Sequence, residues 1–183
     1  MKKHLFTLCF CACVLLSHAQ VIPDPNPIPE GYKGSIVLTY DPLGGNGGMK
    51  DATVCYSHIG LITDKSTGTK DWKYIKNSAW GTTTEPQWTK SGSKWQLTIP
   101  NMYTYFGCPE EEEIKAIIMV FHNGKGNSSL EGKTANGGDI LVYVGRETGS
   151  IWDDFTPAAV TKQARPAGIE NGIYYGADGT SVT

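Results

Sequence analysis

The stretch Ile114-Lys115-Ala116-Ile117-Ile118-Met119-Val120-Phe121-His122 decides the fold, because it is an almost unbroken apolar run that ends at the turn residues Asn123-Gly124. A continuous run of this kind is typical of a strand that is covered on both faces. Residues 53–63, which read TVCYSHIGLIT, form a second apolar stretch rich in β-branched and aromatic residues. These two stretches predict the central strands of a β-sheet.

Shorter strand signals surround this pair. They lie at residues 35–40, 71–75, 95–99 and 140–144, separated by turn signals such as the Gly-rich segment 44–48 and Pro100. No stretch of useful length repeats apolar residues with the helical period, and residues 110–115 are expected to add one helical turn. Seven or so short strands over residues 35–145 predict an all-β, Ig-like β-sandwich with flexible N- and C-terminal segments.

The first 19 residues have the features of a secretory signal peptide. Lys2 and Lys3 precede an apolar run, and Ser17-His18-Ala19 offers a cleavage site before Gln20. The run is too short to span a membrane. We therefore expect a protein that is secreted or held at the cell surface, with no transmembrane segment; a lipoprotein anchored through Cys13 is the alternative.

Two further segments flank the predicted sandwich. Residues 20–34 have proline at every second position from Pro23 to Pro29, which predicts an extended linker outside the sheet because proline has no N–H to donate. Residues 146–183 predict another linker and the start of a following, truncated domain, since residues 171–176 have strand signals. The alternative is a disordered tail.

Composition limits the function. The chain has 183 residues, a formal charge of −2 and 19% charged residues, so no basic stripe favours nucleic acid. The four glutamates at 110–113 are typical of a solvated face, and two histidines alone make no metal site, so we expect no cofactor. Cys55 and Cys108 remain after signal removal, either as a disulfide or as two separate buried thiols.

The catalytic signals are weaker than the aromatic ones. Glycoside hydrolysis needs two carboxylates across a cleft, and the acids here show no such pairing, so the chain alone is expected not to be an enzyme. Four of the five tryptophans lie between residues 72 and 95. Aromatic rings bind the apolar face of a sugar while polar groups hydrogen-bond its hydroxyls, so this composition favours a carbohydrate-binding surface.

Several short motifs follow one another along the chain, at residues 54–62, 71–75, 80–81, 97–100, 106–109, 121–126 and 137–140. In this order they resemble the N-terminal Ig-like module that precedes the catalytic barrel in secreted bacterial α-amylase-type glycoside hydrolases, and they are also similar to starch-binding modules. The resemblance covers about residues 35–145. One departure is the loop at residues 126–132, which lacks the tryptophan that similar modules often carry.

The predicted carbohydrate site contains four residues. Trp72 and Trp80 are expected to stack on sugar rings, although burial of one of them in the core is the alternative. Tyr74 is expected on the face of Trp72 by the strand period of two. By the resemblance, His58 contacts sugar hydroxyls; its alternative is a half-buried histidine bonded to the backbone. His122 is expected to be an exposed loop residue.

These features predict a non-catalytic module that binds α-glucan, meaning starch, glycogen or maltooligosaccharide. By the resemblance, its partner in the full-length protein is a C-terminal catalytic domain of the α-amylase type, absent from this chain, which the module brings to its substrate. Trp88 and Trp95 are expected in the core instead. The alternatives are a structural Ig-like spacer, which would bury Trp72 and Trp80, and a stand-alone surface glycan-binding protein.

Overall fold

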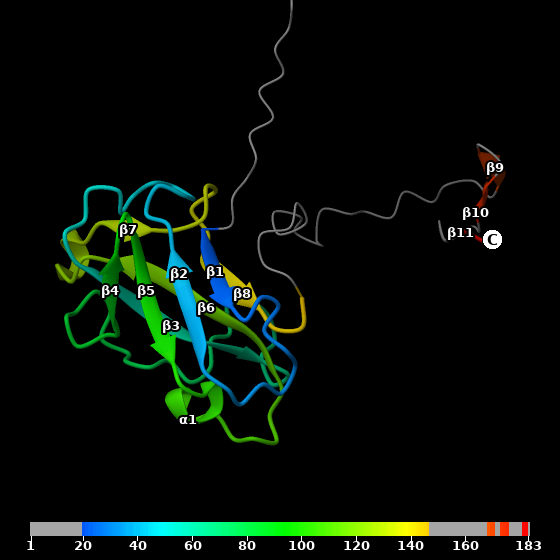
Figure 1. Cartoon of the computed structure of the whole chain (residues 1–183), viewed down its shortest axis with the longest axis horizontal. Coiled ribbons are helices and arrows are strands. Elements are labelled where there is room, and N and C mark those ends of the chain that lie inside the picture. Colours follow the sequence, from blue (N-terminus) through cyan, green and yellow to red (C-terminus); the bar gives the residue numbers. More distant parts are fainter. Residues whose placement is uncertain (1–19, 147–167, 171–172, 176–180, 183) are drawn as a thin grey trace, which may run out of the picture. The chain divides into compact units, whose positions relative to one another are not determined.

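The computed structural model of the chain describes residues 20–146 and three short stretches nearer the C-terminus, at 168–170, 173–175 and 181–182. The described residues fall into two units, each with its own antiparallel sheet (Figure 1). The smaller sheet contains β9 (Gly168–Glu170), β10 (Ile173–Tyr175) and β11 (Ser181–Val182), with β10 in the middle. Strand β10 falls inside the expected strand at residues 171–176, while the predicted linker at the start of this region lies outside the described residues.

The larger unit holds eight strands whose named pairings are all antiparallel. Their path is β1-β2-β5-β4-β3-β6-β7, and β8 pairs separately with β6. The strands are β1 (Val21–Asp24), β2 (Ile36–Tyr40), β3 (Cys55–Thr63), β4 (Gln87–Ser91), β5 (Lys94–Ile99), β6 (Ile114–His122), β7 (Glu131–Gly132) and β8 (Ile140–Tyr143).

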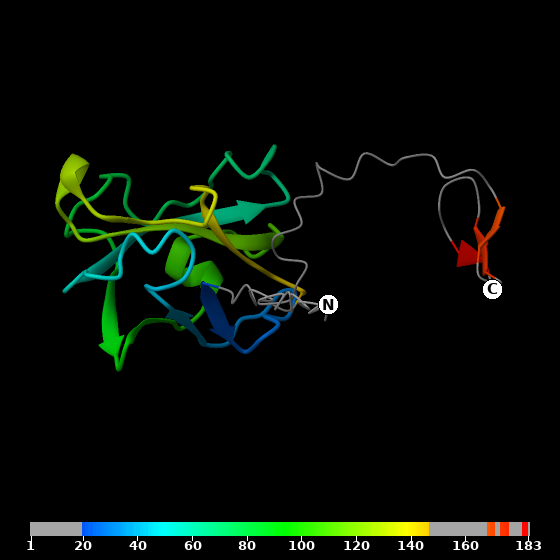
Figure 2. The same ribbon diagram turned by 90° about the horizontal axis from the view of Figure 1, so that it is seen from above.

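The sheet curls into two layers because β4 takes part in both. The second half of β4 pairs with β5, whereas its first residues, Gln87 and Trp88, pair with Tyr56 and Cys55 of β3. Figure 2 shows β1 and β2 in one layer and β3 and β6 in the other. This arrangement confirms the predicted all-β, sandwich-like fold, and the long central strands β3 and β6 lie where the sequence predicts them.

The core fills the space between the layers. Alternate residues of β2 point inward, so that Tyr40 stacks on Phe121 of β6 with ring centroids 3.6 Å apart. Trp88 lies edge-on to Phe121, with centroids 4.8 Å apart, and its Nε1 donates a hydrogen bond of 2.8 Å to Oγ of Ser57. Trp88 and Trp95 are both buried, as predicted.

The proline-rich segment belongs to the fold, so the predicted linker at residues 20–34 is wrong. Strand β1 pairs with β2, and Pro23 lies opposite Leu38. Proline is tolerated there because β1 is the end strand of the path and needs ladder hydrogen bonds on one side only. Val21 and Ile28 are buried in the core, which fixes the first half of the segment to the fold.

Two other local predictions are also wrong. Residues 71–75 form no strand; only Lys73 bridges to β3, at Leu61. The helical turn lies earlier than expected, in α1 (Met102–Phe106), because Asn101 accepts the N–H of Thr104 at the N-cap and Gly107 ends the helix with φ 74°. A short 3-10 turn, η1 (Gly126–Ser128), follows β6.

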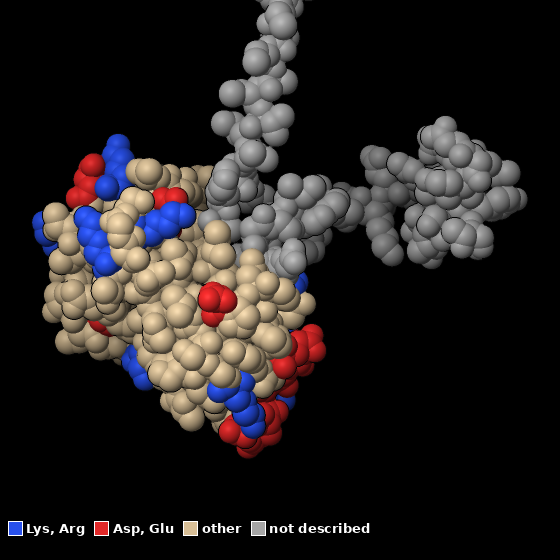
Figure 3. All heavy atoms as spheres, in the orientation of Figure 1, with Lys and Arg blue, Asp and Glu red and all other residues tan. Residues whose placement is uncertain are grey.

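Charges of both signs lie close together on the face shown in Figure 3, at two opposite ends of the larger unit. Among the described residues, no helix is long and apolar enough to cross a membrane. Cys55 and Cys108 are both buried and both free, so of the two arrangements considered the structure has the separate thiols.

Candidate functional site

The candidate site lies on the outer face of the β3–β6 layer. Side chains alternate along β3, so Ile59 and Leu61 enter the main core while Ile62 belongs to a smaller cluster on the opposite face. His58 has the same parity as Ile62 and therefore points outward. On β6, His122 has the parity of Ile118, which is in the same outer cluster. The register places Tyr56 opposite His122 and His58 opposite Val120.

The segment between β3 and β4 runs back over this layer. Lys73 exchanges two backbone hydrogen bonds of 2.8 Å with Leu61, and the N–H of Lys76 donates to the carbonyl of Ile59. Trp72, just before this contact, packs against the outer cluster of Ile62, Ala116 and Ile118. The segment therefore delivers Trp72 and, further along, Trp80 to the face that carries the two histidines.

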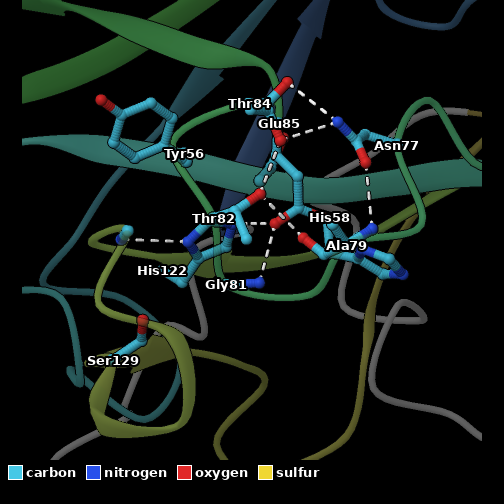
Figure 4. Close-up of polar contacts among 12 residues, drawn as sticks. Tyr56, His58, Asn77, Ala79, Gly81, Thr82, Thr84, Glu85, His122 and Ser129 are labelled. Atoms are coloured by element: carbon cyan, nitrogen blue, oxygen red, sulfur yellow. Dashed lines mark hydrogen bonds and ion pairs between the residues drawn. The ribbon is translucent and has the colours of Figure 1, made fainter.

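Glu85 is the centre of the site. Its side chain is fully buried, and it lies between His58 and His122 (Figure 4). Oε1 contacts Nδ1 of His58. Oε2 accepts the N–H of Gly81 at 2.9 Å and lies 2.7 Å from Nε2 of His122, although the angle of that second contact is outside the range of a regular hydrogen bond. The carboxylate of Glu85 thus contacts β3, β6 and the segment between β3 and β4 to which Glu85 itself belongs.

The protonation of His122 follows from its partners. Its Nδ1 accepts a hydrogen bond of 3.1 Å from the N–H of Gly124, so the proton of the neutral ring is on Nε2, which faces Glu85. Burial lowers the pKa of His122 below its usual value, against the opposing attraction of Glu85. His122 is therefore a neutral, buried donor.

Aromatic rings surround the histidines. The ring centroid of His58 lies 5.5 Å from that of Trp72 and 5.5 Å from that of Trp80. The Trp80 ring also lies 5.5 Å from that of His122, and the His122 ring stacks on Tyr56. Both indoles are half-buried, and 17% of the His58 side chain is exposed. Nε2 of His58 has no hydrogen-bond partner in the described part of the chain.

Three of the four predicted site residues come together: Trp72, Trp80 and His58. Tyr74 does not join them. Its φ of 51° breaks the strand alternation, its ring packs against the main core, and its hydroxyl donates a 2.6 Å hydrogen bond to Oε1 of Glu112. The expectation that Tyr74 shares a face with Trp72 is therefore wrong.

Both histidines differ from the alternatives considered for them. His122 is fully buried in β6, so the expectation of an exposed loop residue is wrong. His58 is half-buried, but it contacts a carboxylate rather than the backbone. Sequence reasoning missed Glu85 altogether, because an acid inside the polar stretch 82–86 gives no sign of burial, and its partner His58 lies 27 residues away.

Glu85 stands between the two imidazoles, and the described residues contain no group of three or more His, Cys, Asp or Glu side chains placed to hold a metal ion. What the site offers is a pair of indole surfaces with one polar ring nitrogen between them.

No protein-family model matches this chain, and no curated protein matches it either. The likeness to the modules of α-amylase-type enzymes therefore rests on the motifs quoted above.

The lowered pKa of His122 predicts an acid-sensitive fold. Unfolded His122 takes up a proton as the pH falls through about 6.5, whereas the folded protein does not do so until the pH reaches its lower pKa. Between these two values this residue should lower the free energy of unfolding by up to about 1.4 kcal/mol for each pH unit of acidification. Urea unfolding measured from pH 7.5 downward checks this. A His122→Gln variant should have a flatter profile, and an unchanged slope would contradict the assignment.

Proposed function

We propose that this protein binds a carbohydrate, of the α-glucan class, at the surface formed by Trp72, His58 and Trp80. The observation that carries the proposal is the placement of two half-buried indoles at equal distance from one half-buried imidazole. The three side chains come from β3 and the segment between β3 and β4. We name this group of residues the aromatic site.

The chemistry of the aromatic site suits a sugar. A pyranose ring has an apolar face of C–H groups that packs on an indole, and a rim of hydroxyls that hydrogen-bond to polar atoms. His58 supplies such an atom between the two indoles, since its Nε2 has no partner among the described residues. By analogy with other stacking on aromatic side chains, each platform is worth about 1–3 kcal/mol.

The further parts of the proposal rest on the resemblance. In this account the protein is secreted, the ligand is starch, glycogen or a maltooligosaccharide, and the binding brings a linked α-amylase-type catalytic domain to its substrate. Tethering of this kind raises the local concentration of substrate without new chemistry. Tyr74 has no part in the site, because its hydroxyl is bonded to Glu112.

Affinity electrophoresis in gels with and without soluble starch tests the proposal. The native protein should be retarded by starch. Trp72→Ala and Trp80→Ala should each lower the affinity by about 5-fold to 150-fold, as expected for the loss of 1–3 kcal/mol. Tyr32→Ala, which removes another half-buried aromatic ring that packs on the main core, is the matched control and should be retarded like the native protein.

The outcomes separate the alternatives. If the folded native protein runs with the same mobility in both gels, α-glucan binding is wrong and the structural spacer becomes the better account. If starch retards all four proteins equally, a glucan is bound elsewhere than at the aromatic site.

A further inference from the structure

The hydrogen bonds around Glu85 indicate which of the neighbouring atoms carry protons. Nδ1 of His122 accepts the N–H of Gly124, so in the neutral ring the proton is on Nε2, which lies 2.7 Å from Oε2 of Glu85. Oε2 also accepts the N–H of Gly81. An oxygen that faces two N–H groups has no room for a proton of its own, and both groups stabilise a negative charge there.

The remaining oxygen of Glu85 shares one proton with His58. Oε1 and Nδ1 are in contact, and two bare acceptors would repel each other at that distance. An N–H that donates to a carboxylate oxygen makes a charge-assisted hydrogen bond, which places the shared proton on Nδ1. When the His58 ring is neutral, Nδ1 then carries its only proton and Nε2 keeps a lone pair.

We propose that Glu85 is a positioning residue that holds the proton of neutral His58 on Nδ1, so that Nε2 acts as a hydrogen-bond acceptor between Trp72 and Trp80. The part of this inference that concerns a ligand rests on the proposed function. It then adds a specificity: the sugar must offer a hydroxyl as donor at this position, and an O-methylated sugar fits the indoles but not the imidazole. A site built to receive a hydroxyl discriminates strongly against ligands that lack it.

Glu85→Gln tests this proposal, because glutamine has nearly the same shape as glutamate. One of the two acceptor oxygens is replaced by an NH2 group, which donates hydrogen bonds. The N–H groups of Gly81 and His122 require an oxygen at the position of Oε2. The amide nitrogen of the new glutamine must then face His58 and donate to Nδ1. In this variant the proton of neutral His58 moves to Nε2, and the ligand-facing atom becomes a donor.

Nitrogen NMR of the ¹⁵N-labelled protein at pH 8 measures this directly, since protonated and bare imidazole nitrogens have well-separated shifts. We expect Nδ1 of His58 to be protonated and Nε2 bare in the native protein, with the two exchanged in Glu85→Gln; loss of the signals in His58→Gln assigns them. A native protein with the proton on Nε2 would overturn the inference, and this measurement needs no ligand.

Binding gives the second readout. Maltoheptaose should bind Glu85→Gln about tenfold more weakly, the equivalent of one lost hydrogen bond of about 1.4 kcal/mol, whereas Glu113→Gln, an exposed glutamate paired with Lys115, should bind like the native protein. Equal binding by a Glu85→Gln protein whose tautomer has changed would refute the positioning role. Absence of binding by the native protein would refute the proposed function and leave the tautomer result standing.

Discussion

Replacing Trp88 with alanine should lower the free energy of unfolding by about 3–5 kcal/mol, the range for loss of a large aromatic side chain from a packed core. Trp88 is only 1% exposed and lies edge-on to both Tyr40 and Phe121. It also stands on β4 at the point where this strand passes from β5 to β3. Its removal would therefore leave a cavity at the junction of the two layers.

Urea unfolding of Trp88→Ala and Trp88→Phe distinguishes the effect of the lost side-chain volume from that of the lost hydrogen bond to Ser57. Phenylalanine fills most of the space but cannot donate to Ser57, which is fully buried, so we expect a smaller loss of about 1–2 kcal/mol. A loss below about 1 kcal/mol for Trp88→Ala would mean that the layers are not held together at this ring. The loss of about 3–5 kcal/mol expected for Trp88→Ala is a substantial fraction of the free energy of unfolding of an ordinary domain.

The central strands are the part of the fold that could be predicted best. Strand β6 has the predicted bounds, and β3 lies within its predicted stretch, because both are apolar on both faces and such runs need no knowledge of the partner. Both faces are covered, one by the main core and the other by the outer cluster around Ile118.

Edge elements were not predictable in the same way. Pro23 of β1 excludes a central strand, and only the topology reveals that β1 is an end strand that can tolerate it. Trp88 is the one apolar residue of β4, and the other residues of this strand are polar and exposed. The strand therefore has no apolar pattern by which it could be predicted. At Tyr74, a left-handed backbone conformation in a non-glycine residue overturned an argument that depended on strand alternation.

The aromatic site could be predicted from its residue types, whereas the buried carboxylate of Glu85 next to it could not. Tryptophans in a polar segment indicate a binding surface, and the structure brings Trp72 and Trp80 to His58. The buried carboxylate of Glu85 contacts three groups from separate parts of the chain, which are the N–H of Gly81 and the rings of His58 and His122. A buried acid carries no local pattern, because a solvated glutamate between threonines looks the same in sequence.

Removing the carboxylate altogether, in Glu85→Ala, should lower the free energy of unfolding by about 3–5 kcal/mol, as expected when one partner of a buried charged contact is deleted. Alanine leaves the N–H groups of Gly81 and His58 with no acceptor at a position where the Glu85 side chain is fully buried.

The comparison with Glu85→Gln identifies the cause of this loss. Glutamine keeps an oxygen for Gly81 and His122, so it should cost much less, about 1–2 kcal/mol, in the same urea experiment. Glu113→Ala is the surface control and should change the free energy of unfolding by less than about 0.5 kcal/mol. If Glu85→Ala were as stable as Glu113→Ala, the carboxylate would not be holding its loop against β3 and β6. A large loss for alanine with a small one for glutamine would show that stranded N–H groups, rather than the missing negative charge, are what the fold cannot accommodate.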